Sequence, residues 1–263
     1  MKRLTAFLKR RPVFCCLLAA AVLMTAFSGV QTSRAALTMA SNNYNAQLVT
    51  DTTIHAALLE NGTRISDSAD PAAAQPLLGG LAAGEGRFHL GQNYSEALAV
   101  QNTGSIDEYV RVVVYKYWTD GSGNKLTGLD PDLIQIGFAA QDGQVSPLGA
   151  SGDWVVDPDA SATKERTVLY YRTPLAAGET SAPLMDTLRI RGDLADLVTT
   201  TETQRAQDGK TYTTITASYP YEGMTFALEV EVDCVQTHNA AAAIQSAWGA
   251  KVSVDEAGSL SLQ

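Results

Sequence analysis

Few side chains in this sequence are spaced for catalysis or for metal binding. The three histidines, His55, His89 and His238, lie far apart, and none belongs to a zinc-binding His-Glu-x-x-His helix. The sequence also lacks a Cys-x-x-Cys pair, a Gly-x-Ser-x-Gly nucleophile turn and a phosphate-binding glycine loop. Scattered residues can still meet in space, but no pattern here points to a reaction. We therefore expect no enzyme, no catalytic residue and no cofactor.

The best candidate for a cation site is acidic. Asp153, Asp157 and Asp159 lie in one short stretch, and Ca²⁺ prefers several oxygen ligands from a flexible loop. Their spacing does not match an EF-hand loop, and the residues Trp154-Val155-Val156 between them are typical of a strand. The sequence favours the alternative, a solvated charged loop, so no metal site is predicted.

The first 35 residues have the three parts of a secretory signal peptide. A basic start is followed by an apolar run from Val13 to Phe27 and by small residues that end at Ala35. The run is shorter than the ~20 residues of a membrane-spanning helix, although an uncleaved anchor is the alternative. We predict cleavage after Ala35. The product is then secreted, extracellular or associated with the cell surface, and has no membrane segment.

Loss of residues 1–35 changes the charge and the cysteine content. They contain six of the 19 Lys and Arg residues and none of the 28 Asp and Glu residues, so the remainder carries a formal charge of −15. Such a chain repels nucleic acid and anionic membranes. Of the three cysteines only Cys234 remains, so the monomer has no internal disulfide. Its roughly 228 residues are enough to bury a core without such a cross-link.

A period of two dominates the remaining sequence, which is typical of β-strands. Between residues 225 and 234 apolar side chains alternate with acidic ones, which predicts a half-buried strand with Cys234 on its inward face. Residues 109–118 are β-branched and aromatic on both faces, which predicts a central strand or one covered by a partner. Further strands are expected at 47–49, 53–59, 96–101, 133–138, 154–156, 167–172, 184–190, 211–219, 251–254 and 259–262.

Turns and short helices complete the expected domain. Asn61-Gly62-Thr63 matches a glycosylation sequon, but Asn-Gly more simply marks a hairpin turn. A helix is expected at 239–249 and a second short one at 192–199, while 66–86 is expected to be a long loop. These patterns predict an all-β, jelly-roll-like antiparallel sandwich with one or two short helices, preceded by the signal-peptide helix. The expected domains are the signal peptide (1–35), an N-terminal extended segment (36–50) and the sandwich (51–263).

Three stretches of the chain resemble the TasA/camelysin family of Gram-positive bacteria, whose members are exported by a dedicated signal peptidase of the SipW-dependent type. They are the signal peptide, the stretch from Val100-Gln101-Asn102-Thr103-Gly104 to Tyr109-Val110-Arg111-Val112, and the stretch from Val230 to Trp248-Gly249. The resemblance implies a jelly roll that polymerises into extracellular biofilm-matrix fibres. It implies self as the partner, with other matrix components or an accessory assembly protein as further ones. Some members are described as metallopeptidases, but this chain shows no zinc motif onto which that activity can be carried.

In such fibres an N-terminal segment of one subunit completes the sheet of the next. The start of the mature chain alternates apolar with small or polar residues, and main-chain pairing lets an extended segment bind an open sheet edge. We expect a head-to-tail homopolymer formed by donor-strand addition. The alternatives are a disordered tail and a monomeric secreted binding module for a carbohydrate or host ligand, which an exposed aromatic platform would favour. The candidate assembly residues are Ala36, Leu37, Met39, Tyr44 and Leu48.

Overall fold

The structure is a computed structural model and describes residues 52–82, 89–207 and 210–263, which all belong to one compact unit. The predicted signal peptide, the segment 36–50 and the strand expected at 47–49 lie outside these residues. Within the described part of the chain, no helix has the length and apolar character needed to cross a membrane.

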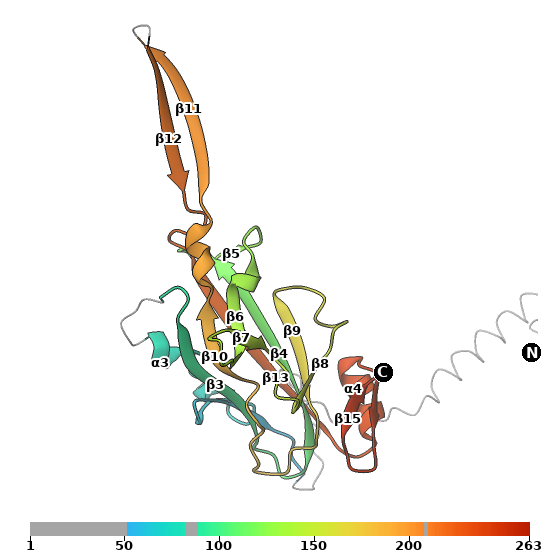
Figure 1. The fold of residues 1–263 in the computed structure, drawn as a ribbon. Helices are drawn as coiled ribbons and strands as arrows, with labels where there is room; N and C mark the ends of the chain where they lie inside the picture. The colour runs from blue at the N-terminus through green and yellow to red at the C-terminus, as the bar shows by residue number, and fades with distance from the viewer. Residues whose placement is uncertain (1–51, 83–88, 208–209) are drawn as a thin grey trace, which may run out of the picture. The chain divides into compact units, whose positions relative to one another are not determined.

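Two antiparallel sheets form most of the described structure (Figure 1). The larger sheet contains β1 (Ala56–Glu60), β2 (Thr63–Asp67), β3 (Asn93–Asn102), β6 (Ile134–Ala139), β7 (Val145–Pro147) and β10 (Met185–Ile190). The smaller sheet contains β4 (Glu108–Thr119), β5 (Lys125–Leu126), β8 (Trp154–Val156), β9 (Arg166–Tyr171) and β13 (Thr225–Gln236). Their strand orders are β2-β1-β3-β10-β6-β7 and β13-β4-β9-β8, with β5 paired to β4.

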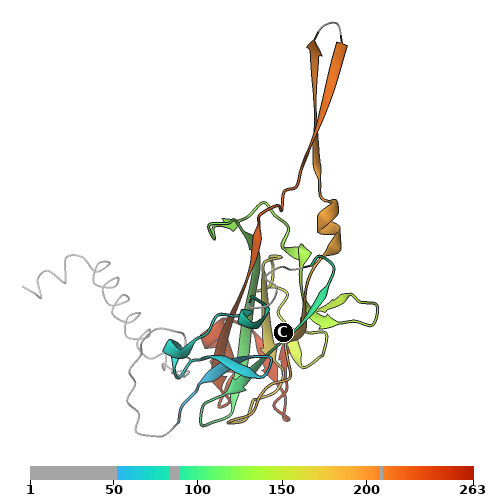
Figure 2. The ribbon, with the colours of Figure 1, turned by 90° about the vertical axis from the view of Figure 1, so that its left-hand side faces the viewer.

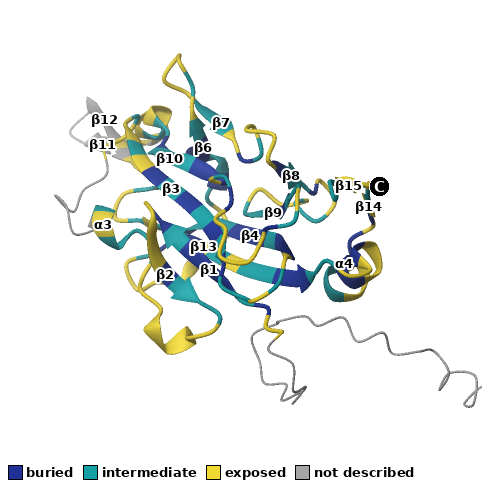
Figure 3. Ribbon diagram, turned by 90° about the horizontal axis from the view of Figure 1, so that it is seen from below, coloured by how far each residue is buried: buried dark blue, intermediate teal, exposed yellow. Residues whose placement is uncertain are grey.

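The inward faces of the two sheets share one hydrophobic core. Alternate residues of β3, among them Leu98 and Val100, belong to the same buried cluster as Val112 and Val114 of β4. Figure 3 shows buried segments, in dark blue, on β3, β4 and β10. This packing confirms the predicted all-β sandwich, because the inward residues of both sheets, which alternate along strands such as β3, meet in one core.

A third layer covers the outer face of the smaller sheet. It consists of α4 (Ala240–Trp248) and the hairpin of β14 (Val252–Val254) and β15 (Leu260–Leu262). Val113 and Tyr109 on the outer face of β4 pack in one cluster with Ile244 of α4 and Leu260 of β15. The strand β4 is therefore central and covered on both sides, as its two apolar faces predict.

A long hairpin stands apart from both sheets. Its strands β11 (Thr199–Gln207) and β12 (Lys210–Ser218) pair only with each other among the described residues, and Figures 1 and 2 both show them extending away from the sandwich. We call this hairpin, Thr199–Ser218, the arm. The sequence predicts β12 but not β11, and the helix expected at 192–199 is only the 3-10 turn η3 (Gly192–Asp196).

The remaining connections refine the sequence predictions. The hairpin expected at Asn61-Gly62 is present, and both residues have the positive φ of such a turn, at 50° and 80°. It leads into β2, so the loop expected from residue 66 begins inside a strand. That loop also contains two short turns of helix, η1 (Pro71–Ala73) and α3 (Gly79–Ala82), and η2 (Pro131–Leu133) lies in a later connection.

Candidate functional site

The strand β13 presents the longest open edge of the described sandwich. It has 12 residues and pairs with β4 over its whole length, from Thr225 opposite Thr119 to Gln236 opposite Glu108. No described strand pairs with its other side. The other border strands are shorter, with five residues in β2 and three in β7 and in β8. An unpaired row of backbone groups is a template for another strand.

The register shows which backbone groups of β13 face outward. On β4, the N–H groups of Glu108 and Lys116 donate hydrogen bonds to the carbonyl oxygens of Leu175 and Glu165, which lie on the side of β9. The odd-numbered residues of β4 therefore bond to β13, since neighbouring residues of a strand alternate in direction. The odd-numbered residues of β13 oppose them. The N–H and C=O groups of its even-numbered residues are consequently directed to the open edge.

The same even-numbered residues carry the apolar side chains of β13. Leu228 and Cys234 are buried, whereas Val230 and Val232 are only partly buried where they pack against the main core. A strand added at this edge would therefore gain main-chain hydrogen bonds and would cover the exposed part of these valines at the same time.

Acidic side chains lie on the opposite, outer face of β13. Asp233 forms an ion pair with Arg111 on β4, at 2.5 Å, and Glu229 accepts a hydrogen bond from the Tyr117 hydroxyl. Glu231 is exposed. These charges disfavour pairing with another acidic strand, which is a common protection of edge strands. A strand that carries little negative charge would therefore suit this edge better than an acidic one.

A buried carboxyl group lies on β4 beside the C-terminal end of β13, opposite Gln236. Glu108 has no exposed surface, and neither of its oxygens accepts a hydrogen bond from an N–H or O–H group of the described residues. Its polar neighbour is the Cys234 thiol, a weak donor. Burial raises the pKa of Glu108 to about 8, and burial beside this carboxyl raises the pKa of Cys234 far above its usual range. Cys234 is thus the buried core residue that the sequence predicts.

A second buried carboxyl group faces the interior from the larger sheet. Glu96 is 2% exposed; burial and the adjacent Glu60 carboxyl raise its pKa to about 7, while the Asn61 amide lowers it. Glu60 accepts a hydrogen bond from the Leu78 N–H group at 2.7 Å. Two neighbouring carboxylates in one buried site repel each other. One of the two carboxyl groups therefore tends to keep its proton.

An aromatic cavity of about 480 Å³ lies on the outer side of the smaller sheet. Its wall contains Tyr170 and Trp248, whose ring centroids are 5.6 Å apart, and the Arg111 guanidinium lies 5.3 Å from the Trp248 ring. Arg166 and Lys251 also line it. Burial and the nearby Asp157 carboxylate raise the pKa of Tyr170 to about 12. Tyr170 is buried and Trp248 is partly exposed, so a single aromatic ring, Trp248, is accessible beside the polar groups of the cavity.

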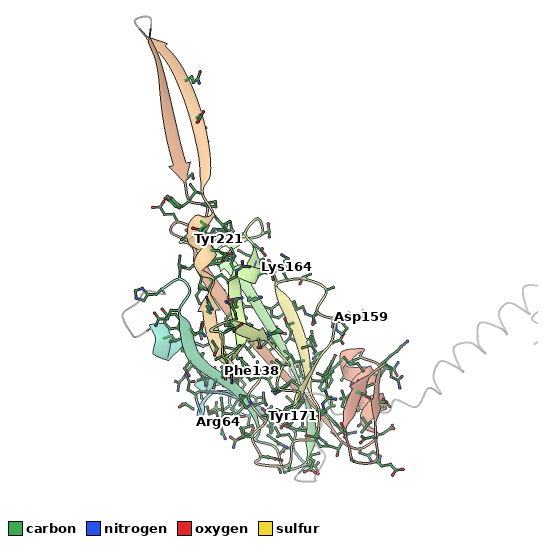
Figure 4. All side chains as sticks on the ribbon, in the orientation of Figure 1. Arg64, Phe138, Asp159, Lys164, Tyr171 and Tyr221 are labelled. Carbon is green, nitrogen blue, oxygen red and sulfur yellow. The ribbon has the colours of Figure 1, made fainter. Side chains whose placement is uncertain are left out.

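The three acidic residues that the sequence offers as cation ligands differ in their burial. Asp157 is buried, and its oxygens accept hydrogen bonds from the Asp159 and Ala160 N–H groups and from the Tyr170 hydroxyl. Asp153 and Asp159 are exposed; Figure 4 labels Asp159 on the loop beside the C-terminal layer. Within residues 52–82, 89–207 and 210–263, no three His, Cys, Asp or Glu side chains form a metal-binding group.

The three histidines are all at least partly exposed. His55 is half-buried, and His89 and His238 are exposed. The five candidate assembly residues between Ala36 and Leu48 lie outside the described residues, so their role stays a prediction. The alternation at 225–234 identified the strand, but not that it lies at a border.

No protein-family model, curated protein or solved structure matches the chain.

Proposed function

We propose that the protein is a secreted structural subunit of extracellular matrix fibres. Polymerisation is head-to-tail: the segment 36–50 of one copy adds as a strand to the outer edge of β13 in the next copy. The open edge carries this proposal, because from Leu228 to Cys234 it offers outward-directed backbone groups and two partly buried valines. The resemblance to the TasA/camelysin family supports the same function.

The two ends of the sandwich favour a head-to-tail arrangement. Ala56 at the start of β1 lies opposite Asn102, whereas Asn93, at the other end of β3, lies opposite Arg189. The described chain therefore begins at the end of the sandwich opposite to the arm. We call the end at which the described chain begins the β1 end; it also contains Gln236. We call the opposite end, which contains Thr225, the arm end.

A donor segment fits β13 in direction and in length. A segment that leaves the β1 end of one copy meets the arm end of the next copy, where β13 begins. Along this edge it would run antiparallel to β13, as β4 does on the other side. Its roughly 15 residues reach about 50 Å when extended, whereas the 12 residues of β13 span about 40 Å.

The charge of the segment suits the acidic strand. Residues 36–50 contain no Asp, Glu, Lys or Arg, while the outer face of β13 carries Glu229, Glu231 and Asp233. A neutral strand can therefore pair beside these carboxylates without like-charge repulsion. Donor-strand addition is in this respect compatible with a mature chain whose formal charge is −15.

Electron microscopy and sedimentation of two proteins test the function. Residues 36–263 should form fibres, and residues 42–263 should remain a folded monomer because Leu37 and Met39 are missing. The proposal fails if both proteins make the same fibres. It also fails if residues 36–263 make none across a range of pH and salt.

A pair of proline variants tests the edge itself. Val232→Pro removes an outward N–H group and leaves the β4 ladder intact, so the monomer should fold but no longer polymerise. Glu231→Pro removes an N–H group that bonds to β4, so it should destabilise the monomer. If Val232→Pro forms fibres in the same yield as the parent protein, the edge of β13 is not the acceptor.

A second candidate function is a monomeric binding module, which the aromatic cavity favours. The partly exposed Trp248 ring offers apolar surface beside Arg111 and Lys251, an arrangement suited to a carbohydrate. Titration calorimetry with cellohexaose, chitohexaose and oligogalacturonate tests it, with Trp248→Ala as the comparison. Binding that Trp248→Ala abolishes, together with no fibres from residues 36–263, would make the module the better interpretation.

A further inference from the structure

The arm end of the sandwich concentrates the exposed apolar side chains of the described chain. Its large exposed hydrophobic residues are Leu90 (43%), Leu197 (43%), Val198 (38%) and Tyr219 (51%). Leu197 and Val198 directly precede β11, and Tyr219 directly follows β12. Leu90 is next to Gly91, whose N–H group bonds to the Ile190 carbonyl at 2.7 Å, at this same end. We call these four residues the apolar patch.

The root of the arm is firmly attached to the sandwich. The Tyr221 ring packs edge-on against Trp118 with ring centroids 5.1 Å apart, and its hydroxyl accepts a hydrogen bond from the Asp130 N–H group at 3.1 Å. Figure 4 labels Tyr221 where the arm meets the sandwich. Beside it a cleft of about 310 Å³ is lined by Leu129, Leu197, Val198 and Pro220 among others. Leu197 and Val198 of the patch therefore line a hollow beside this fixed support.

No described strand outside the arm pairs with it, and its described side chains, at 201–204, 216 and 218, are exposed. Each of its strands has nine residues, so it reaches about 30 Å. An isolated two-stranded hairpin is at best marginally stable in water, and exposed apolar residues, Leu197, Val198 and Tyr219, gather at its root. Both observations indicate that a partner covers this end of the molecule.

We infer that the arm and the apolar patch bind a second copy of this chain. The inference rests on the proposed head-to-tail fibre, in which the arm end of one copy faces the β1 end of the next. An arm of about 30 Å would then lie along roughly three quarters of a neighbour whose longest strands span about 40 Å. The arm is a second contact between the same two copies that the donor segment joins.

The charge distribution favours a copy of the same chain as the partner. Residues 199–218 contain two acidic residues, Glu202 and Asp208, and two basic ones, Arg205 and Lys210, so the arm is formally neutral. The mature chain as a whole carries −15. A neutral arm and an apolar patch are the parts of this surface that an equally acidic copy can approach without strong repulsion.

Two tethered contacts stabilise a polymer more than either contact alone. Once the donor segment has bound, the arm binds the same neighbour at a high effective concentration. The arm should therefore slow dissociation of subunits and lower the critical concentration for assembly. The arm alone, without the donor segment, should not support fibres.

Replacement of residues 199–218 by Gly-Ser-Gly tests this role. The sandwich should fold as before, because no described strand of either sheet pairs with the arm, and denaturant unfolding checks this. The critical concentration should rise roughly tenfold or more. An unchanged critical concentration would overturn the arm contact and leave the proposed function standing. Absence of fibres from the parent, residues 36–263, would overturn both.

A photo-cross-linking amino acid in place of the exposed Thr203 identifies the partner directly. Fibres are assembled from equal amounts of ¹⁴N- and ¹⁵N-labelled protein, and the same amino acid in place of the exposed Gln245 of α4 serves as the background control. The Thr203 position should give mixed-isotope cross-links in fibres and none in the monomer of residues 42–263. Cross-links within single copies only, or no cross-links in fibres, would contradict the inference.

Discussion

Two buried carboxyl groups, Glu96 and Glu108, make the stability of this sandwich depend on pH. Their pKa values in the folded chain are raised to about 7 and about 8, whereas an unfolded glutamate has a pKa of ~4.3. The folded state therefore binds more protons than the unfolded state between these values. The stabilisation is complete below about pH 4 and is lost as the pH rises through about 7 and about 8.

We predict that the free energy of unfolding falls from pH 5 to pH 9. Each carboxyl group contributes a slope of about 1.4 kcal/mol per pH unit while it remains protonated only in the folded state. Glu108→Gln should remove one such contribution and flatten the profile. Denaturant titrations of residues 42–263 at pH 5, 7 and 9 measure this, and Glu231→Gln, at an exposed position, is the control. An identical slope in Glu108→Gln and the parent would contradict the assignment.

The residue scale also shows what the sequence can reveal. The alternation around Cys234 correctly placed the thiol on the inward face of a strand. It did not reveal the contact between Cys234 and Glu108, because that contact depends on β4 and β13 being neighbours across more than 100 positions of sequence. The acidic residue at the start of β4 reads as solvent-exposed until this pairing is known.

At the scale of elements, β13 is both a core strand and an open edge. Its even-numbered side chains support the core, and its even-numbered backbone groups face outward. The first role predicts an effect on stability, and the second an effect on assembly. Substitutions that change one without the other separate the two roles.

We predict that truncation of the inward face of β13 destabilises the monomer. Leu228→Ala should cost about 2–3 kcal/mol, because Leu228 is 9% exposed. Val230→Ala should cost about 1 kcal/mol, because this side chain is only partly buried. Glu231→Ala, on the outer face, should change the free energy of unfolding by less than about 0.5 kcal/mol. Equal effects at all three positions would mean that the inward face is assigned wrongly.

The sequence predicted the long strands and also the short strands β8, β14 and β15, but it missed β2, β5, β7 and β11. The alternation of apolar residues revealed β13, and the β-branched and aromatic composition revealed β4. The strand β11 is rich in threonine and lacks an apolar face, and β2, β5 and β7 are short. The border position of β13 could not be predicted, since strand order is fixed by packing between distant segments.

At the scale of the whole molecule, the charge of residues 36–263, the proposed mature chain, opposes the proposed assembly. Copies with a formal charge of −15 repel each other, and salt screens this repulsion over a Debye length of about 30 Å at 0.01 M and about 8 Å at 0.15 M. The neutral segment 36–50, the neutral arm and the apolar patch provide contacts that do not add to the repulsion.

We therefore predict that salt promotes polymerisation. The critical concentration of residues 36–263, measured by sedimentation, should fall as NaCl increases from 0.01 to 0.15 M. Sucrose at matched osmolality controls for effects other than screening. A critical concentration that rises with salt would indicate contacts dominated by ion pairs between copies, contrary to the apolar and main-chain contacts proposed.

The central claim is that the outer edge of β13 is open in the monomer and filled by another copy in the fibre. Hydrogen–deuterium exchange of single backbone amides tests it most directly. The amides of Leu228, Val230 and Val232 should exchange rapidly in the monomer of residues 42–263 and slowly in fibres of residues 36–263. The amides of Ala227, Glu229 and Glu231, which bond to β4, should be protected in both. The account is contradicted if the even-numbered amides are already protected in the monomer, or if they exchange equally fast in the fibre.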